Sequence, residues 1–246
     1  MSNLNLNTYN DRSVLKWYDT ITGLTSIEKK VFEQHASALE NVLDIGIGRG
    51  RTTAYLLNKC TSYTGIDYSK GFVELVSQKY PATDIRQMDA RDLGAFENSS
   101  FDLVNFSFNG IDYVDLEGRK KILAEIYRIL KPGGIFFFST HNKNHATFNK
   151  PAWINPTNSL WTNIKTFVKL LPWLPTHFRQ QKNEHIQKEY AIINDSAHNY
   201  GLLTFYTSPA FLKEQLNENG FSDTVLYSEN GELGDWIFAT TRKLLP

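Results

Sequence analysis

The chain has little of what marks secreted and membrane-spanning proteins. Cys60 is its one cysteine, which excludes an internal disulfide framework and a cysteine-rich zinc site and fits a reducing compartment. No run of about 18 apolar residues occurs, and Met1 to Asn10 lack the basic and apolar regions of a signal peptide. We therefore expect a cytoplasmic protein without an integral membrane segment.

The formal net charge of the chain is zero. The 246 residues hold 26 lysines and arginines and 26 aspartates and glutamates, so the chain as a whole has no electrostatic preference for nucleic acid or an anionic membrane. This balance predicts that nucleic acid is not a partner. The length suits one α/β domain with an insertion, so we expect residues 1–246 to form a single domain.

From Asn41 to Thr140, short apolar runs alternate with amphipathic helical stretches, which is typical of a parallel sheet wrapped by crossover helices. Apolar spacing predicts a helix over 119–130, and Ser208 predicts the start of another that ends before Gly220. The strands predicted along the whole chain are 42–45, 63–66, 83–88, 101–106, 135–139, 224–227 and 235–240.

The segment 143–200 breaks this rhythm. It holds three of the five tryptophans, Trp153, Trp161 and Trp173, and up to Tyr190 it carries seven lysines and arginines against two glutamates, a net charge of +5. We interpret it as a lid or insertion between the fifth and sixth strands. Such a lid would close on a carboxylate- or phosphate-bearing substrate, although its tryptophans would equally pack on the sheet.

The segment Asp44-Ile45-Gly46-Ile47-Gly48-Arg49-Gly50 stands where the first strand would lead into a helix. Its small residues allow the backbone to approach a nucleotide-like ligand closely. The NAD fingerprint requires a third glycine where this chain has Arg51, so NAD fits poorly. The segment resembles motif I of the class I S-adenosylmethionine-dependent methyltransferases, Asp-x-Gly-x-Gly-x-Gly.

Four more landmarks that resemble this family follow in the family's order, within residues 41–140. They are Gly65-Ile66-Asp67-Tyr68-Ser69, Met88-Asp89-Ala90-Arg91-Asp92-Leu93, the segment from Phe101 to Gly110, and Leu130-Lys131-Pro132-Gly133-Gly134. The resemblance implies a Rossmann-like α/β fold whose seven-stranded sheet is parallel except for an antiparallel last strand. It also implies an enzyme that uses S-adenosylmethionine and releases S-adenosylhomocysteine.

By this resemblance, Asp67 would bind both ribose hydroxyls of the donor, with Tyr68 against one face of the adenine. Asp89 would accept a hydrogen bond from the adenine amino group, beside the backbone of Ala90. Arg49 would pair with the donor carboxylate or start a helix at the surface. The complete predicted donor site is Asp44, Gly46, Gly48, Arg49, Gly50, Asp67, Tyr68, Ser69, Asp89, Ala90, Ser107 and Asn109.

Two candidate catalytic residues follow the fourth and fifth strands. His141 has an ordinary pKa of about 6.5, which suits a general base, although it would equally be a loop histidine bonded to nearby backbone. Asp112 would orient the acceptor proton or cap the next helix. His141 and His145 lack the His-Glu-x-x-His pattern and an accompanying carboxylate cluster, so we expect no metal.

Aromatic residues outside the landmarks are further candidates. Tyr9, Trp17 and Tyr18 precede the first strand, in a segment that in this family often folds over the donor, although such residues are commonly core. In the insertion, His198 and Tyr200 would reach the acceptor if the lid closes.

The acceptor is less defined. Members of the family that methylate bases or glutamine carry an Asn-Pro-Pro-aromatic motif after the fourth strand. This chain has Asn109-Gly110-Ile111-Asp112 there instead, which favours a small-molecule acceptor. The basic insertion favours a sugar or an acidic metabolite, methylated on O or N. The alternatives are a noncatalytic S-adenosylmethionine-binding protein and a methyltransferase that meets a lipid-like acceptor at a membrane surface through 161–175. The sequence also leaves a homodimer open.

Overall fold

The predicted apolar runs between Asn41 and Thr140 form five neighbouring parallel strands. In the computed structural model, which describes residues 2–154, 158–228 and 231–245, these strands lie side by side in the order β3-β2-β1-β4-β5. Their bounds are β3 (Asp84–Gln87), β2 (Ser62–Asp67), β1 (Asn41–Ile45), β4 (Phe101–Phe106) and β5 (Leu130–Asn142). Because all five run in one direction, their carboxyl ends share one edge of the sheet.

The sheet is completed beyond β5 by two strands from the end of the chain. β10 (Trp236–Lys243) pairs antiparallel with β5, and β9 (Phe221–Tyr227) pairs antiparallel with β10. The predicted fold, with seven strands of which the last is antiparallel, is therefore confirmed. Both strands are longer than predicted, because Phe221 pairs with Lys243 and Ser222 with Arg242.

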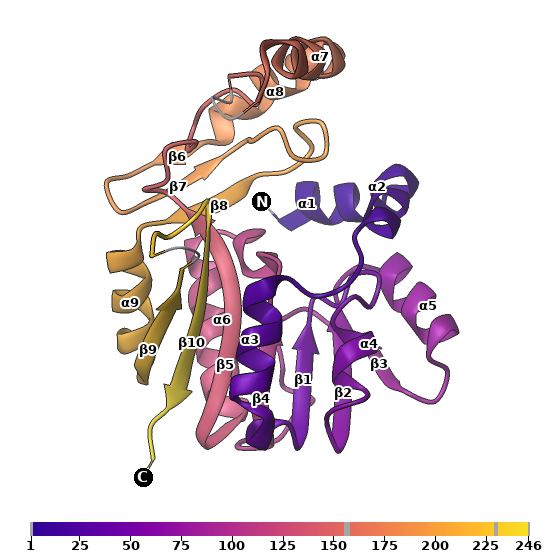
Figure 1. Cartoon of the computed structure of the whole chain (residues 1–246), viewed down its shortest axis with the longest axis vertical. Coiled ribbons are helices and arrows are strands. Elements are labelled where there is room, and N and C mark those ends of the chain that lie inside the picture. The colour runs from indigo at the N-terminus through magenta and orange to yellow at the C-terminus, as the bar shows by residue number, and fades with distance from the viewer. Residues whose placement is uncertain (1, 155–157, 229–230, 246) are drawn as a thin grey trace.

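Helices cover both faces of this sheet (Figure 1). α3 (Ser26–Gln34) and α4 (Thr53–Leu56) pack on one face, α6 (Leu116–Ile129) and α9 (Pro209–Glu218) pack on the other, and α5 (Lys70–Lys79) lies beside β2 and β3. The predicted cap of α9 is confirmed, since the Ser208 hydroxyl accepts from the Phe211 amide at 3.2 Å. α6 begins three residues earlier than predicted because Asp115 caps it through the Gly118 amide.

The core follows the alternation of side chains along β5. Phe136 and Phe138 face α6 and α9, whereas Phe137 faces α3, where its ring centroid lies 5.5 Å from that of Phe32. All three phenylalanines of β5 are fully buried. A strand buried on both faces needs such a continuous apolar run, and this explains why 135–139 was readable from the sequence.

The segment after β5 adds helices and three more strands, and these strands join the same sheet. It contains α7 (Leu160–Leu170), α8 (Leu174–Gln180), β6 (His185–Ile186), β7 (Tyr190–Ile193) and β8 (Thr204–Thr207). β8 pairs parallel with the end of β5, where His141 faces Tyr206, and β7 pairs antiparallel with β8. α7 and α8 lie farthest from the seven-stranded sheet (Figure 1). That this segment acts as a lid stays a prediction.

The N-terminal helices lie across the carboxyl edge of the sheet. α1 (Ser2–Tyr9) and α2 (Arg12–Trp17) run above β1 and β2 (Figure 1). The buried Asn5 amide fixes α1, since it donates to the carbonyls of Tyr113 and Leu203 at 2.9 Å and accepts from the Leu203 amide at 3.0 Å. In the described ranges, no helix is both long and apolar enough to cross a bilayer.

The packing of β5 on α3 predicts the effect of truncating Phe137. Phe137→Ala should lower the free energy of unfolding by about 3–5 kcal/mol, because it removes a fully buried ring from contact with Phe32 and Phe238. Urea denaturation followed by circular dichroism measures this change. Val225→Ala, at a site that is 50% exposed on β9, is the control and should cost about 0.5 kcal/mol or less. Equal losses in both variants would contradict the packing described.

Candidate functional site

The glycine loop after β1 has a backbone that larger residues would not adopt. Gly46 has a φ of +67°, and a Cβ there would lie 3.0 Å from the Phe106 ring. A Cβ on Gly110, at the end of β4, would lie 2.2 Å from the same ring. Phe106 therefore fills the space between the two loops, and both loops need glycine to let it pack. Gly50 is buried and faces Tyr80 and Val76 of the α5 region.

Asp44, the first residue of the predicted loop motif, is a structural anchor. It is 1% exposed, and it accepts hydrogen bonds from Thr52 at 2.7 Å, Tyr63 at 2.8 Å and Asn105 at 2.6 Å. Burial raises the pKa of Asp44, and these three hydrogen bonds oppose the shift. The carboxylate thus joins β1, β2 and β4 beneath the loop. Asp44 and Arg49 both line a small cavity that adjoins the main one.

The main cavity opens at the carboxyl ends of β1, β2 and β4. Its volume is about 830 Å³ including its open mouth. Its wall includes most of the predicted donor residues and several aromatic rings. The lining residues on which the site depends are Tyr9, Tyr18, Gly46, Gly48, Asp67, Tyr68, Phe72, Asp89, Ala90, Ser107, Phe108 and Tyr113.

Asp67 is the buried carboxylate of this cavity. It is 4% exposed, and its two oxygens accept from the backbone amides of Gly48 at 3.0 Å and Ser69 at 2.8 Å. Burial raises the pKa of Asp67 to about 6, and the amide hydrogen bonds limit the shift. Each carboxylate oxygen can accept two hydrogen bonds, so each keeps one position for a hydroxyl donor in the cavity.

Tyr68, Asp89 and Ala90 line the wall next to Asp67. The Tyr68 hydroxyl is buried and has no hydrogen-bond partner among the described residues. Asp89 receives a hydrogen bond from Arg91 Nε at 2.9 Å. Burial acts to raise the pKa of Asp89, but the hydrogen bonds and charge of Arg91 outweigh it and lower that pKa. Asp89 is therefore ionised and paired at neutral pH.

Aromatic rings from the N-terminal segment form the roof of the cavity. Tyr9 packs edge-on against Tyr68 at 5.9 Å and Tyr113 at 5.1 Å, while Tyr18 stacks on His198 at 5.7 Å. His198 and Tyr200, predicted to be near the acceptor, thus belong to this roof and its support. The Trp17 side chain lies outside the described residues.

The remaining predicted donor residues take other positions. Ser69 faces away from the cavity wall, since its hydroxyl donates to Asn10 at 2.8 Å. Ser107 lines the cavity directly. Asn109 sits between the cavity residues Phe108 and Gly110, and both Phe108 and Asn109 have left-handed backbones, with φ of 63° and 61°. Such strain in non-glycine residues concentrates at functional sites.

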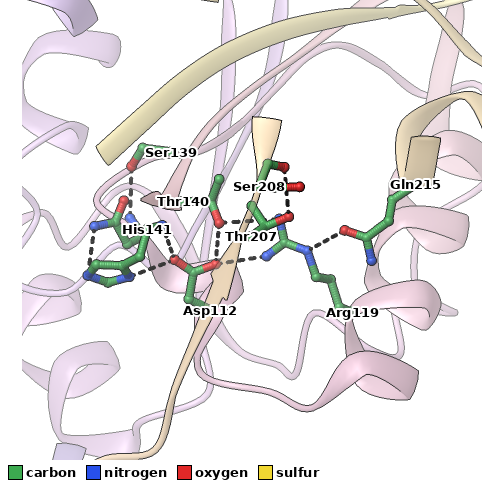
Figure 2. Close-up of polar contacts among 9 residues, drawn as sticks. Asp112, Arg119, Ser139, Thr140, His141, Thr207, Ser208 and Gln215 are labelled. Carbon is green, nitrogen blue, oxygen red and sulfur yellow. Dashed lines mark hydrogen bonds and ion pairs between the residues drawn. The ribbon is translucent and has the colours of Figure 1, made fainter. Parts of the chain in front are cut away.

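Asp112 and His141 form a hydrogen-bonded pair next to Asn109 (Figure 2). Asp112 Oδ2 accepts from the His141 backbone amide at 2.7 Å and from Nδ1 of its ring at 2.8 Å. The ring's other nitrogen, Nε2, lies 3.3 Å from Nδ2 of the Asn109 side chain. The hydrogen bond to Asp112 places the ring proton on Nδ1, so Nε2 accepts a hydrogen bond from Asn109 Nδ2.

Arg119 neutralises this pair from the far side. Its Nη1 lies 2.8 Å from Asp112 Oδ1, to which Thr140 also donates. Asp112 and Arg119 are fully buried. Each oxygen of Asp112 accepts two hydrogen bonds, from Arg119 and Thr140 or from the amide and ring of His141, so its four acceptor positions are used by the protein (Figure 2). In this geometry Asp112 orients His141 and does not reach an acceptor. The alternative that Asp112 caps the following helix is wrong, because Asp115 caps α6.

The electrostatics favour a basic His141. Burial acts to lower the pKa of His141, but the hydrogen bond and the charge of Asp112 outweigh it, so the pKa is raised. A base with a raised pKa holds a proton more strongly once it has taken one. In the part of the chain that the structure describes, no group of three His, Cys, Asp or Glu residues is placed to hold a metal ion.

Sequence reasoning missed Arg119, although a signal existed. Arg119 occupies the same helical stripe as Ile122, Leu123 and Ile126, and an arginine on an apolar stripe must find a buried partner. Sequence reasoning also missed the partner of Arg51, the residue that stands where the NAD fingerprint has its third glycine. Arg51 forms a two-pronged ion pair with the buried Glu28 of α3, at 2.5 and 2.6 Å.

Comparisons with known proteins agree with this geometry. Residues 43–138 match the model of a methyltransferase domain family. A probable S-adenosylmethionine-dependent methyltransferase of Mycolicibacterium smegmatis is 28% identical over 137 residues, which are 56% of this chain and 52% of that relative. The chain thus spans about half of that relative. A demethylmenaquinone methyltransferase of Staphylococcus epidermidis is 26% identical over 238 residues, covering 89% of this chain and 86% of the relative.

A solved structure shows the same fold. The Burkholderia thailandensis 1,6-didemethyltoxoflavin-N1-methyltransferase, with its substrate and S-adenosylhomocysteine bound, has a TM-score of 0.57 and 16% identity over 89% of this chain and 77% of that one. The sheet order, the glycine loop and the strand-end carboxylates occupy the places that the five sequence landmarks predicted. Residues 43–138 therefore match a methyltransferase domain family, and the relatives named above are methyltransferases.

Proposed function

We propose that this enzyme transfers a methyl group from S-adenosylmethionine to an oxygen or nitrogen atom of a small molecule, with His141 as the general base. The observation that carries the proposal is the cavity at the carboxyl edge of the sheet, which Asp67, Phe108 and Gly110 line, because Asn109 between the last two lies 3.3 Å from His141 Nε2. A donor pocket and a base in contact through Asn109 suit a methyl transfer that includes loss of a proton.

The residues present fit the donor. Asp67 keeps one acceptor position on each oxygen for the ribose hydroxyls, and the buried Tyr68 hydroxyl without a partner offers a further polar contact. The positive φ of Gly46 and Gly48 lets the backbone approach the ligand. S-adenosylmethionine supplies a methyl group already activated on a sulfonium, so the protein has mainly to place the acceptor in line with it.

His141 would accept the proton that an alcohol acceptor loses. When the acceptor oxygen takes the methyl group, the donor's carbon–sulfur bond would break to release S-adenosylhomocysteine and the acceptor's proton would pass to Nε2, while Asp112 holds Nδ1–H and stabilises the charged ring. Arg119 in turn places a positive charge 2.8 Å from Asp112 at a fully buried position. An amine that is already neutral would need the base less, so the pair favours a hydroxyl acceptor.

The acceptor class predicted from the sequence, a sugar or an acidic metabolite, rests on the basic insertion. Lys165, Lys169 and Arg179 of that insertion are exposed, and Arg91 is the cation on the wall of the main cavity that pairs with Asp89. Because the three cations of the insertion are exposed and Arg91 is paired with Asp89, the structure supports an acidic acceptor less than the sequence suggested. The noncatalytic alternative would leave the Asp112–His141 pair with a structural role only, at the end of β5.

A lipid-like acceptor is the second candidate, and a specific observation favours it. Leu160, Trp161 and Val168 of α7 are 77%, 65% and 60% exposed, so they pack on neither the sheet nor the cavity. The relative from Staphylococcus epidermidis that matches 89% of this chain is named for demethylmenaquinone. Both candidates use the same donor site and the same base.

The donor site is tested by substituting Asp67. Asp67→Ala should weaken S-adenosylmethionine binding by about 2–4 kcal/mol, because the ribose hydroxyls lose a charged acceptor. Asp84→Asn, an exposed carboxylate at the opposite end of β3, is the matched control and should leave binding unchanged. Calorimetric titration with S-adenosylmethionine, S-adenosylhomocysteine and NAD measures both. NAD binding without S-adenosylmethionine binding would overturn the proposal.

The pH dependence of donor binding follows from the same carboxylate. The ionised form of Asp67 accepts two hydroxyl hydrogen bonds, whereas the protonated form accepts fewer. Because burial raises its pKa to about 6, affinity for S-adenosylmethionine should be full at neutral pH and should fall as the pH drops through about 6. Calorimetry between mildly acidic and neutral pH measures the fall, and Asp67→Asn should abolish it. A pH-independent affinity in the wild type would contradict the role of Asp67.

The base is tested through turnover. His141→Gln should lower the turnover number by about 100-fold and leave donor affinity within about twofold, whereas His185→Gln, an exposed histidine, should change neither. Wild-type turnover should rise with pH through the raised pKa of His141, and Asp112→Asn should move this rise to lower pH. Release of S-adenosylhomocysteine with sugars, acidic metabolites and lipid-like alcohols measures it. A profile that Asp112→Asn leaves in place would show that the pair is structural.

A further inference from the structure

The helical hairpin α7–α8 carries an apolar face that the rest of the described chain does not cover. Leu160, Trp161, Ile164, Val168 and Leu171 are between 42% and 77% exposed. At about 100° per residue, these side chains fall within an arc of about 100° on α7. Soluble proteins rarely expose large apolar side chains in one contiguous group, so this face points to a binding surface.

The buried side of the same helix shows how α7 is held. Leu170 is 5% exposed and lies on the opposite side of α7 from Val168 and Trp161, while the ring of Phe167 packs against Trp153 at 5.3 Å. The helix is therefore anchored along one line and presents its apolar face outward. α7 lies at the outermost end of the molecule (Figure 1).

Charge indicates what covers the face. Lys165 and Lys169 both lie beside the Trp161 edge of the apolar arc on α7, Arg179 lies on α8, and all three are exposed. The 58 residues from Ile126 to Asn183 contain no aspartate or glutamate, although the chain as a whole is neutral. The positive charge is thus concentrated where the apolar face is.

From these observations we propose that the α7–α8 hairpin docks the enzyme on an anionic phospholipid surface. A helix with leucine and tryptophan on one side and lysines along one edge of that side lies in the plane of a membrane interface, with the apolar side chains in the acyl boundary and the lysines at the headgroups. A second copy of the chain fits less well, because a twofold contact would bring the two sets of lysines together.

The hairpin also contacts the roof of the donor cavity. The His177 ring of α8 lies 3.1 Å from Asn194 Oδ1 and packs on Tyr200, and the neighbouring His198 stacks on Tyr18 at the cavity. The helices that would dock are therefore packed against residues that support the cavity roof. The inference deepens the lipid-like alternative of the proposed function, but the binding itself requires neither donor nor acceptor.

Vesicle flotation of the full chain tests the proposal. Vesicles of phosphatidylcholine with about a third phosphatidylglycerol should carry the protein, pure phosphatidylcholine should carry much less, and high salt should weaken the binding. Lys165→Glu/Lys169→Glu and Trp161→Ser/Val168→Ser should each weaken partitioning by about tenfold or more. Lys120→Glu/Lys121→Glu on α6 and Val225→Ser on β9 are the matched controls and should partition as the wild type.

Three results would overturn the docking. They are absence of wild-type binding to the anionic vesicles, equal binding by all variants, and a wild-type dimer in sedimentation that Trp161→Ser/Val168→Ser dissociates. Calorimetry with S-adenosylmethionine on every variant separates this inference from the proposed function. Vesicle binding without donor binding would contradict the proposed function and leave the docking standing. Donor binding without vesicle binding would contradict the docking and leave the proposed function standing.

Discussion

The ion pair between Asp112 and Arg119 joins the elements on which the candidate active site depends. Both side chains are fully buried, and their 2.8 Å contact links the short helix η3 (Gly110–Asp112) after β4 to α6 on the face of the sheet. Through Thr140 and His141 the pair also holds the end of β5, and through Gln215 it reaches α9. A buried charge without its partner is strongly unfavourable, so these elements must pack together or not at all.

The cavity combines two carboxylates in different electrostatic states. Asp89 is paired with Arg91, which compensates its charge, while Asp67 receives only neutral backbone donors and has a raised pKa. At neutral pH the charge of Asp67 therefore acts inside a cavity whose other walls are largely tyrosine and phenylalanine rings. Aromatic faces and an uncompensated carboxylate both attract cations, and this suits a donor that carries a positive sulfur.

Much of this architecture was readable from the sequence because it depends on local patterns. The five parallel strands follow from apolar runs, and Gly46 and Gly48 line the cavity as their motif predicted. Asp44 shows the limit, since its motif does not reveal that Thr52, Tyr63 and Asn105 donate hydrogen bonds to its oxygens, and its predicted contact with the donor stays a prediction. Which residues meet a buried carboxylate depends on long-range packing, and the strands β6–β8 were missed because their pairing with β5 is equally non-local.

The short parallel pairing of β8 with β5 has a further consequence for the evolution of specificity. Tyr206 is the register partner of His141, and Thr207 is that of Asn142. The strand that ends the insertion is therefore hydrogen-bonded to the residue proposed as the base, and the rings of His141 and Tyr206 pack at 4.9 Å. Exchange of the insertion between relatives would alter the support of the histidine together with the acceptor surface. A chimera that preserves chemistry while changing substrate would need to keep β8 with its parent sheet.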